Sequence, residues 1–116
     1  MSIKAQELRI GNFLEVGGNI WTVSDIFSNP DELYFKENEN YNHLLNAVGI
    51  PITEEWLLRF GFSNENLLDE YYLEPYYFNI IDMTLDIGGI YVDLKYIHQL
   101  QNLIHALTGK ELELKK

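Results

Sequence analysis

The stretch from residue 82 to residue 95 constrains the fold more than any other part of the chain. Apolar and polar residues alternate in it on both sides of two adjacent glycines. Gly88-Gly89 suits a two-residue turn, in which central residues adopt positive φ. Apolar residues then pair on one face: Ile87 with Ile90, Leu85 with Val92 and Met83 with Leu94. The opposite face collects Asp86 with Tyr91, Thr84 with Asp93 and Asp82 with Lys95. The pattern predicts an antiparallel hairpin with one face in the core and the other in water.

A second hairpin is expected near the start of the chain, with Gly18-Asn19 as its two-residue turn. Its predicted apolar pairs, Val16 with Trp21 and Leu14 with Val23, share one face. Residues 28–42 are rich in Asp, Glu and Asn and are expected to form an exposed acidic loop, with a short third strand over Leu33-Tyr34-Phe35.

Two helices are predicted. Thr53 is a suitable N-cap for the first helix, which Gly61 ends as the left-handed residue after its last turn. The second helix runs from about Tyr96 to Thr108 and is closed by Gly109. The apolar faces expected to be buried are Trp56, Leu57 and Phe60 in the first helix, and Ile97, Leu100, Ile104 and Leu107 in the second.

Pro75 interrupts the tyrosine-rich stretch from Tyr71 to Phe78, which is therefore expected to be an edge strand or an irregular crossing. The predicted element order is β-β-(β)-α-β-β-β-α. This order indicates an α+β fold, with an antiparallel sheet built from two hairpins and covered by two helices, in a single domain over residues 1–116 with a frayed tail over 110–116. A small barrel-like unit formed by the N-terminal hairpin, followed by the C-terminal helix, is the alternative.

Charge limits the classes of partner. The 116 residues include 8 Lys and Arg against 18 Asp and Glu, for a net charge of −10. Direct binding of nucleic acid or of anionic membranes is not expected, because both draw on clustered basic residues. There is no cysteine, which excludes disulfides and thiolate metal sites. The start of the sequence lacks an apolar signal region and no apolar run is long enough to cross a membrane, so a cytoplasmic location is expected.

Two groups of side chains are candidates for binding a ligand or partner. His98, Asn102 and His105 recur on one flank of the second helix, expected to be solvated. Their spacing argues against joint ligation of one metal ion. The second group combines Tyr91 and Asp93 of the hairpin with Tyr76 and Tyr77, because six of the eight tyrosines lie between Tyr71 and Tyr96 and tyrosine is enriched in interfaces. No catalytic residue, metal site or cofactor is assigned.

Three blocks of sequence carry a resemblance. They are Glu7-Leu8-Arg9-Ile10-Gly11-Asn12, the segment Ile52-Thr53-Glu54-Glu55-Trp56-Leu57-Leu58-Arg59-Phe60-Gly61-Phe62, and Ile97-His98-Gln99-Leu100-Gln101-Asn102-Leu103 continuing to Ala106-Leu107-Thr108-Gly109-Lys110-Glu111-Leu112. With these blocks the chain resembles a family of small uncharacterised proteins encoded in phages, prophages and other mobile elements of Bacteroidetes-type bacteria. The resemblance implies a genomic setting, and it carries over no catalytic residues.

Three hypotheses about function follow. The leading one is a non-enzymatic phage- or mobile-element-associated protein that binds a host or self protein partner, as an acidic decoy, a host-defence inhibitor or a homodimer, and whose external partner is basic. The alternative is binding of a small nucleotide by tyrosines and the His98, Asn102 and His105 stripe. A metal-dependent hydrolase using Asp82, Asp86 and Asp93 is the second alternative.

Overall fold

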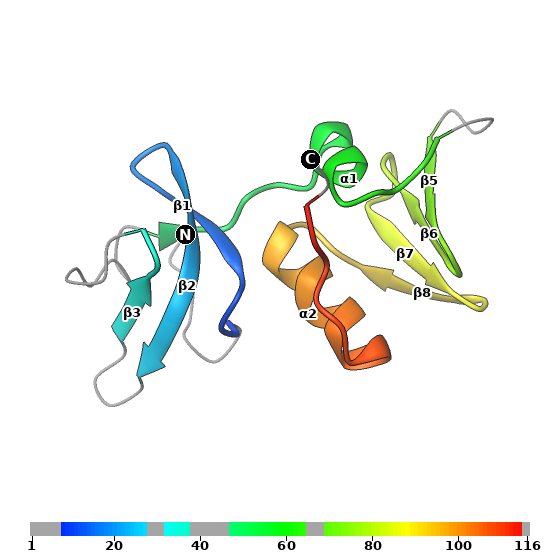
Figure 1. The fold of residues 1–116 in the computed structure, drawn as a ribbon. Helices are drawn as coiled ribbons and strands as arrows, with labels where there is room; N and C mark the ends of the chain where they lie inside the picture. Colours follow the sequence, from blue (N-terminus) through cyan, green and yellow to red (C-terminus); the bar gives the residue numbers. More distant parts are fainter. Residues whose placement is uncertain (1–7, 28–31, 38–46, 65–68, 115–116) are drawn as a thin grey trace. The chain divides into compact units, whose positions relative to one another are not determined.

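The computed structural model describes residues 8–27, 32–37, 47–64 and 69–114 (Figure 1). In these residues the chain forms two helices and two four-stranded antiparallel sheets, an α+β fold as the sequence predicts. The contacts divide the chain into two compact units, Met1–Ile50 with Tyr96–Glu111 and Pro51–Lys95 with Leu112–Lys116. The expectation of a single domain stays a prediction.

The first unit holds a sheet with the strand order β3-β2-β1-β4. Its strands are β1 (Phe13–Val16), β2 (Asn19–Phe27), β3 (Glu32–Phe35) and β4 (Ala47–Val48). The predicted third strand is thus present, whereas β4 was not predicted because two residues carry no periodic signal. The described strands form an open sheet with β3 and β4 at its edges, so the barrel-like alternative is wrong. The rest of the predicted acidic loop, residues 28–31 and 38–42, lies outside the described residues.

The turn of the first hairpin differs from the prediction by one residue. Gly17 and Gly18, with φ of 57° and 86°, form the turn, and the predicted Gly18-Asn19 turn is wrong. Two adjacent residues with positive φ suit glycine, whereas Asn19 begins β2 opposite Val16. The observed pairing is shifted by two residues from the predicted one and joins Leu14 with Trp21. A shift of two leaves every side chain on its predicted face.

Helix α2 (Ile97–Thr108) packs against β1 and is closed by Gly109 at φ 74°, as predicted. Its buried face agrees with the prediction at three of four positions and is rotated toward His98 and Gln101. Ile97, Leu100 and Ile104 are buried, but Leu107 is 43% exposed, and Gln101 and His98 are buried instead. The Gln101 amide explains this, since Nε2 donates to the Gly11 carbonyl at 3.1 Å and Oε1 accepts from the Phe13 N–H at 2.9 Å. Gln101 is buried because it satisfies the backbone hydrogen-bonding groups of Gly11 and Phe13 at the start of β1.

The second unit begins with helix α1 (Glu54–Arg59), whose predicted boundaries are confirmed. Thr53 Oγ1 accepts from the Trp56 N–H at the start. At the end, the N–H groups of Gly61 and Phe62 donate to the carbonyls of Leu58 and Leu57, the paired bonds of a Schellman motif. The predicted apolar face, Trp56, Leu57 and Phe60, is buried.

The sheet of the second unit has the order β5-β6-β7-β8. Its strands are β5 (Glu70–Leu73), β6 (Tyr76–Asn79), β7 (Thr84–Ile87) and β8 (Ile90–Asp93). The tyrosine-rich stretch was expected to be one edge strand or an irregular crossing, and this is wrong. It forms a hairpin, because Pro75 lies in the turn after a cis peptide bond and leaves both flanking segments free to pair. The predicted single sheet built from both hairpins is wrong, because each hairpin pairs with further strands of its own unit and the two hairpins lie in separate sheets.

The Gly88-Gly89 hairpin is confirmed from Ile87 with Ile90 back to Thr84 with Asp93. Met83 leaves the extended conformation, at φ 56°, and receives one hydrogen bond from the Leu94 N–H. The ladder therefore ends at Thr84, and the predicted pairing of Asp82 with Lys95 is not part of the register.

The C-terminal residues 110–114 form neither helix nor strand, but two of them are held in place. The Glu111 carboxylate accepts from the Arg9 guanidinium at 2.6 Å and 2.9 Å, within the first unit. Leu112 is buried. The predicted fraying is therefore not observed in residues 110–114.

The buried face of α2 predicts a contrast between two leucines. Leu100→Ala should lower the free energy of unfolding by about 2–5 kcal/mol, because the Leu100 side chain is fully buried. Leu107→Ala should change it by less than about 1 kcal/mol, because much of the Leu107 side chain already contacts water. Urea denaturation of both variants gives the comparison, and equal losses would contradict the observed rotation of the helix.

Candidate functional site

The sheet of the second unit presents two rows of polar side chains on one face. One row crosses all four strands as Tyr72, Tyr77, Asp86 and Tyr91, each paired with the next. The other row crosses them as Glu70, Asn79, Thr84 and Asp93. Directly opposed residues of neighbouring strands lie about 4.5–5.5 Å apart, so each row is nearly continuous.

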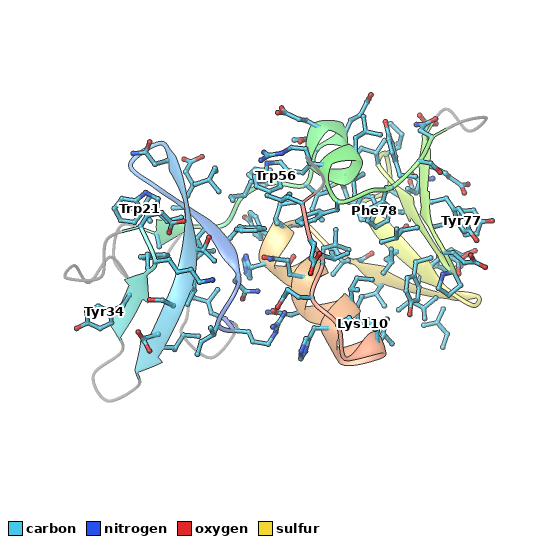
Figure 2. The ribbon with its side chains drawn as sticks, viewed as in Figure 1. Trp21, Tyr34, Trp56, Tyr77, Phe78 and Lys110 are labelled. Carbon is cyan, nitrogen blue, oxygen red and sulfur yellow. The ribbon has the colours of Figure 1, made fainter. Side chains whose placement is uncertain are left out.

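The other face of the same sheet is apolar. Tyr71, Phe78, Leu85 and Val92 form a row of paired residues between the two polar rows, and the first three are buried. Figure 2 shows the alternation within β6, where Phe78 and Tyr77 point to opposite sides of the sheet. Burial raises the pKa of the Tyr71 phenol above its usual value, and a hydrogen bond to Glu54 at the start of α1 adds to the effect.

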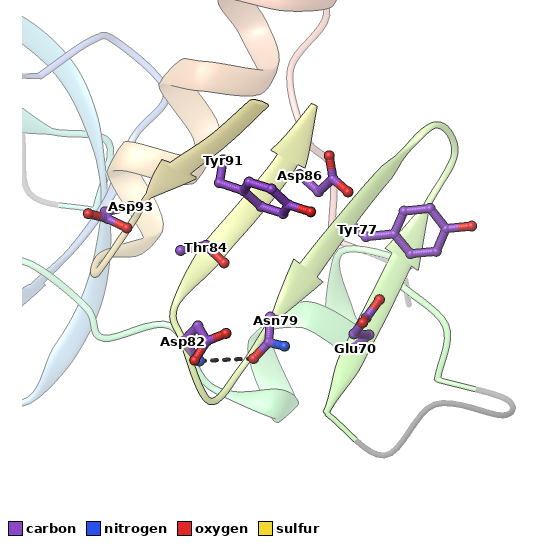
Figure 3. Close-up of a pocket in the computed structure, with 8 residues that line it drawn as sticks. All are labelled: Glu70, Tyr77, Asn79, Asp82, Thr84, Asp86, Tyr91 and Asp93. Atoms are coloured by element: carbon purple, nitrogen blue, oxygen red, sulfur yellow. Dashed lines mark hydrogen bonds between the residues drawn. The ribbon is translucent and has the colours of Figure 1, made fainter. Parts of the chain in front are cut away.

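A cavity of about 610 Å³ lies over the polar rows. Figure 3 shows its lining, which comes from all four strands and the turn between β6 and β7. We call this surface the acidic face, and its residues are Glu70, Tyr77, Asn79, Asp82, Thr84, Asp86, Tyr91 and Asp93. Four of these eight are carboxylates and none is Lys or Arg. The acidic face therefore favours cationic ligands and disfavours phosphates.

Turns position two residues of the acidic face. Asn79 Oδ1 accepts from the N–H groups of Ile81 and Asp82, both at 2.9 Å, and so shapes the turn between β6 and β7. Figure 3 marks the bond between Asn79 and Asp82. Asp86 Oδ1 accepts from the Gly89 N–H at 2.8 Å and braces the turn between β7 and β8. Both polar side chains are thus oriented before any ligand arrives.

The tyrosines give the acidic face an aromatic row beside its carboxylates. The rings of Tyr72 and Tyr77 lie 4.6 Å apart between centroids. Burial raises the pKa of the Tyr72 phenol, with smaller contributions from the charges of Glu74 and Tyr77. Tyr91 is 68% exposed and Tyr77 39%, which leaves two rings open to contact a partner. Aromatic faces and carboxylates together suit a Lys or Arg side chain.

The structure separates the seven candidates that the sequence suggests. Tyr77, Tyr91 and Asp93 line the same cavity. Tyr76 precedes Tyr77 in β6 and therefore lies on the other face of the sheet. The remaining three, His98, Asn102 and His105, belong to α2 in the first unit.

The three residues of the predicted stripe on α2 lie in different surroundings. His98 is buried and stacks on Tyr96, with ring centroids 5.8 Å apart, so its expected place on a solvated flank is wrong. Asn102 Oδ1 accepts from Arg9 Nε at 3.2 Å and from Asn12 Nδ2 at 2.8 Å, within a polar network at the start of β1. His105 is half-buried on the next turn of the helix. His98 and Asn102 thus contribute to the packing of the first unit.

Sequence reasoning placed Thr84 beside Asp93 but missed Glu70 and Asn79 as members of the same surface. Glu70 and Asn79 belong to the hairpin that Pro75 concealed, and only the register of β5 and β6 brings them beside Thr84. A hairpin around Glu74-Pro75, with two adjacent tyrosines on each side, is the signal that could have revealed them.

Within the residues that the structure describes, no group of three or more His, Asp or Glu side chains is placed to hold a metal ion. Neither described helix is long and apolar enough to span a membrane. Searches of protein-family models, curated proteins and solved structures found no match to this chain.

Because the pKa of Tyr71 is raised in the folded state, the free energy of unfolding should decrease at alkaline pH. A phenol whose pKa is raised in the folded state contributes stability that is fully present below the unfolded pKa of about 10 and is lost as the pH rises through the folded value. Urea midpoints should therefore fall as the pH rises above about 10. Tyr71→Phe should flatten this decline, and an unchanged pH profile in the variant would contradict the assignment.

Proposed function

We propose that the chain is a non-enzymatic binding protein that takes a cationic segment of a protein partner on the acidic face. The observation that carries the proposal is the convergence of four carboxylates and two exposed tyrosine rings on one cavity. A lysine or arginine side chain would gain both charge pairing and contact with a ring there. The resemblance to phage and mobile-element proteins supports a host protein as the source of that segment, for example a component of host defence.

Binding of a nucleotide is less well supported than binding of a cation. Its phosphates would lie among Glu70, Asp82, Asp86 and Asp93, with no basic side chain in the lining of the cavity. Homodimerisation, a metal-dependent hydrolase activity and a cytoplasmic location stay predictions.

A peptide of four Lys-Val repeats, acetylated and amidated at its ends, provides the test of this proposal. Asp93→Asn should weaken binding of the peptide about two- to fivefold, because it removes one exposed charge partner. The matched control is Asp25→Asn, since Asp25 is also an exposed strand aspartate but lies in β2 of the other sheet. Fluorescence anisotropy with labelled peptide measures both affinities.

Affinity should also fall as NaCl is raised from about 50 mM to about 500 mM, because exposed charge pairs are screened by salt. Equal losses in Asp93→Asn and Asp25→Asn would mean that the peptide responds only to the net charge of −10, and would contradict a site on the acidic face.

A further inference from the structure

Strand β8 forms one edge of the sheet that carries the acidic face. Among the described strands it pairs only with β7. Its residues Ile90 and Tyr91 are each 68% exposed. Edge strands present unpaired backbone groups to the surroundings and are the places where a further strand can add.

The hydrogen-bond pattern shows which backbone groups of β8 point outward. The Leu94 N–H donates to the Met83 carbonyl at 2.9 Å, so even-numbered residues in this stretch direct their backbone groups toward β7. Tyr91 and Asp93 therefore direct theirs away from β7. Lys95 follows the same alternation, since its carbonyl accepts from the Ile52 N–H at 3.0 Å on the outer side. In the described chain no strand occupies the positions beside Tyr91 and Asp93.

The two residues whose backbone groups point away from β7 are also the ones whose side chains lie on the acidic face. Tyr91 and Asp93 both line the cavity. In an antiparallel pair, a residue directly opposite and hydrogen-bonded to Tyr91 or Asp93 places its own side chain on the same face of the sheet. One added strand would thus bond to the backbone of β8 and present every second side chain to the carboxylates.

We infer that β8 accepts an extended cationic segment of a protein partner as a fifth, antiparallel strand. The segment carries Lys or Arg at alternate positions, above the acidic face, and apolar residues between them, beside Ile90 and Val92 on the opposite face. This inference rests on the proposed function and specifies the conformation and spacing of the partner.

Charge decides between a cationic partner and a second copy of this chain. A second β8 would bring another Asp93 and the carboxylates behind it toward the first set, and like charges brought together in this way repel. A charged side chain on an edge strand is a common protection against self-pairing. The same Asp93 carboxylate attracts the Lys or Arg side chains of a segment with basic residues at alternate positions.

Two methylated versions of the Lys-Val peptide test the inference. Methylation of the Lys backbone nitrogens removes the donors that would face β8, whereas methylation of the Val nitrogens removes donors that face away. Charge and side chains are the same in both peptides. Methylation at Lys should reduce affinity at least about tenfold, and methylation at Val should leave it within about twofold of the parent peptide.

Amide hydrogen exchange of the protein gives an independent readout. On binding of the parent peptide, exchange at the Tyr91 and Asp93 amides should slow at least about tenfold. The Val92 amide, which faces β7 beside Leu85, serves as the internal control and should change little.

The outcomes separate the two proposals. If all three peptides bind alike and the Tyr91 and Asp93 amides stay unprotected, the acidic face binds cations but strand addition is wrong. If methylation at Val is the more damaging change, the antiparallel arrangement is wrong. If none of the peptides binds, the proposed function fails and this inference fails with it.

Discussion

The register of the β7–β8 hairpin is the constraint on which the candidate site depends. A turn over Gly88 and Gly89, both at positive φ, sets Asp86 opposite Tyr91 and Thr84 opposite Asp93. Because side chains alternate across a strand, a slip of one residue would bury these groups and expose Leu85. The β6 register then adds Tyr77 and Asn79 to the same two rows. The charge and the aromatic surface of the acidic face follow from this alignment, and so does the choice of β8 residues whose backbone groups point away from β7.

Three blocks of sequence, residues 8–12, 52–62 and 97–112, serve mainly to build the fold. Arg9 and Asn12 of the first block bond to Asn102 and Glu111 of the last one, and Gln101 reaches the backbone at Gly11 and Phe13. The middle block consists of α1 with its two caps. By contrast, the acidic face lies in the stretch outside these blocks.

Local signals predicted what local chemistry determines. Thr53 and Gly61 bound α1 because caps act within one turn, and the alternation around Gly88 and Gly89 is visible in fourteen consecutive residues, 82–95. Contacts between residues far apart in sequence could not be predicted from such local signals. Gln101 is buried because it bonds to the backbone of Gly11 and Phe13, far away in sequence, and the buried His98 ring lies beside Gly49. A helical wheel of apolar residues shows neither contact. Pro75 predicts a disruption within one strand, but it lies in a turn and leaves a strand on either side.

The most direct test of this account is nuclear Overhauser spectroscopy of the Hα protons in the β7–β8 hairpin. Asp86 with Tyr91, and Thr84 with Asp93, are non-hydrogen-bonded pairs, in which the Cα atoms approach to about 4.5 Å and the Hα protons face one another. The account predicts strong Hα to Hα contacts within both pairs. Contacts displaced by one residue, such as Leu85 with Tyr91, would show a different register, and the acidic face would not exist as described.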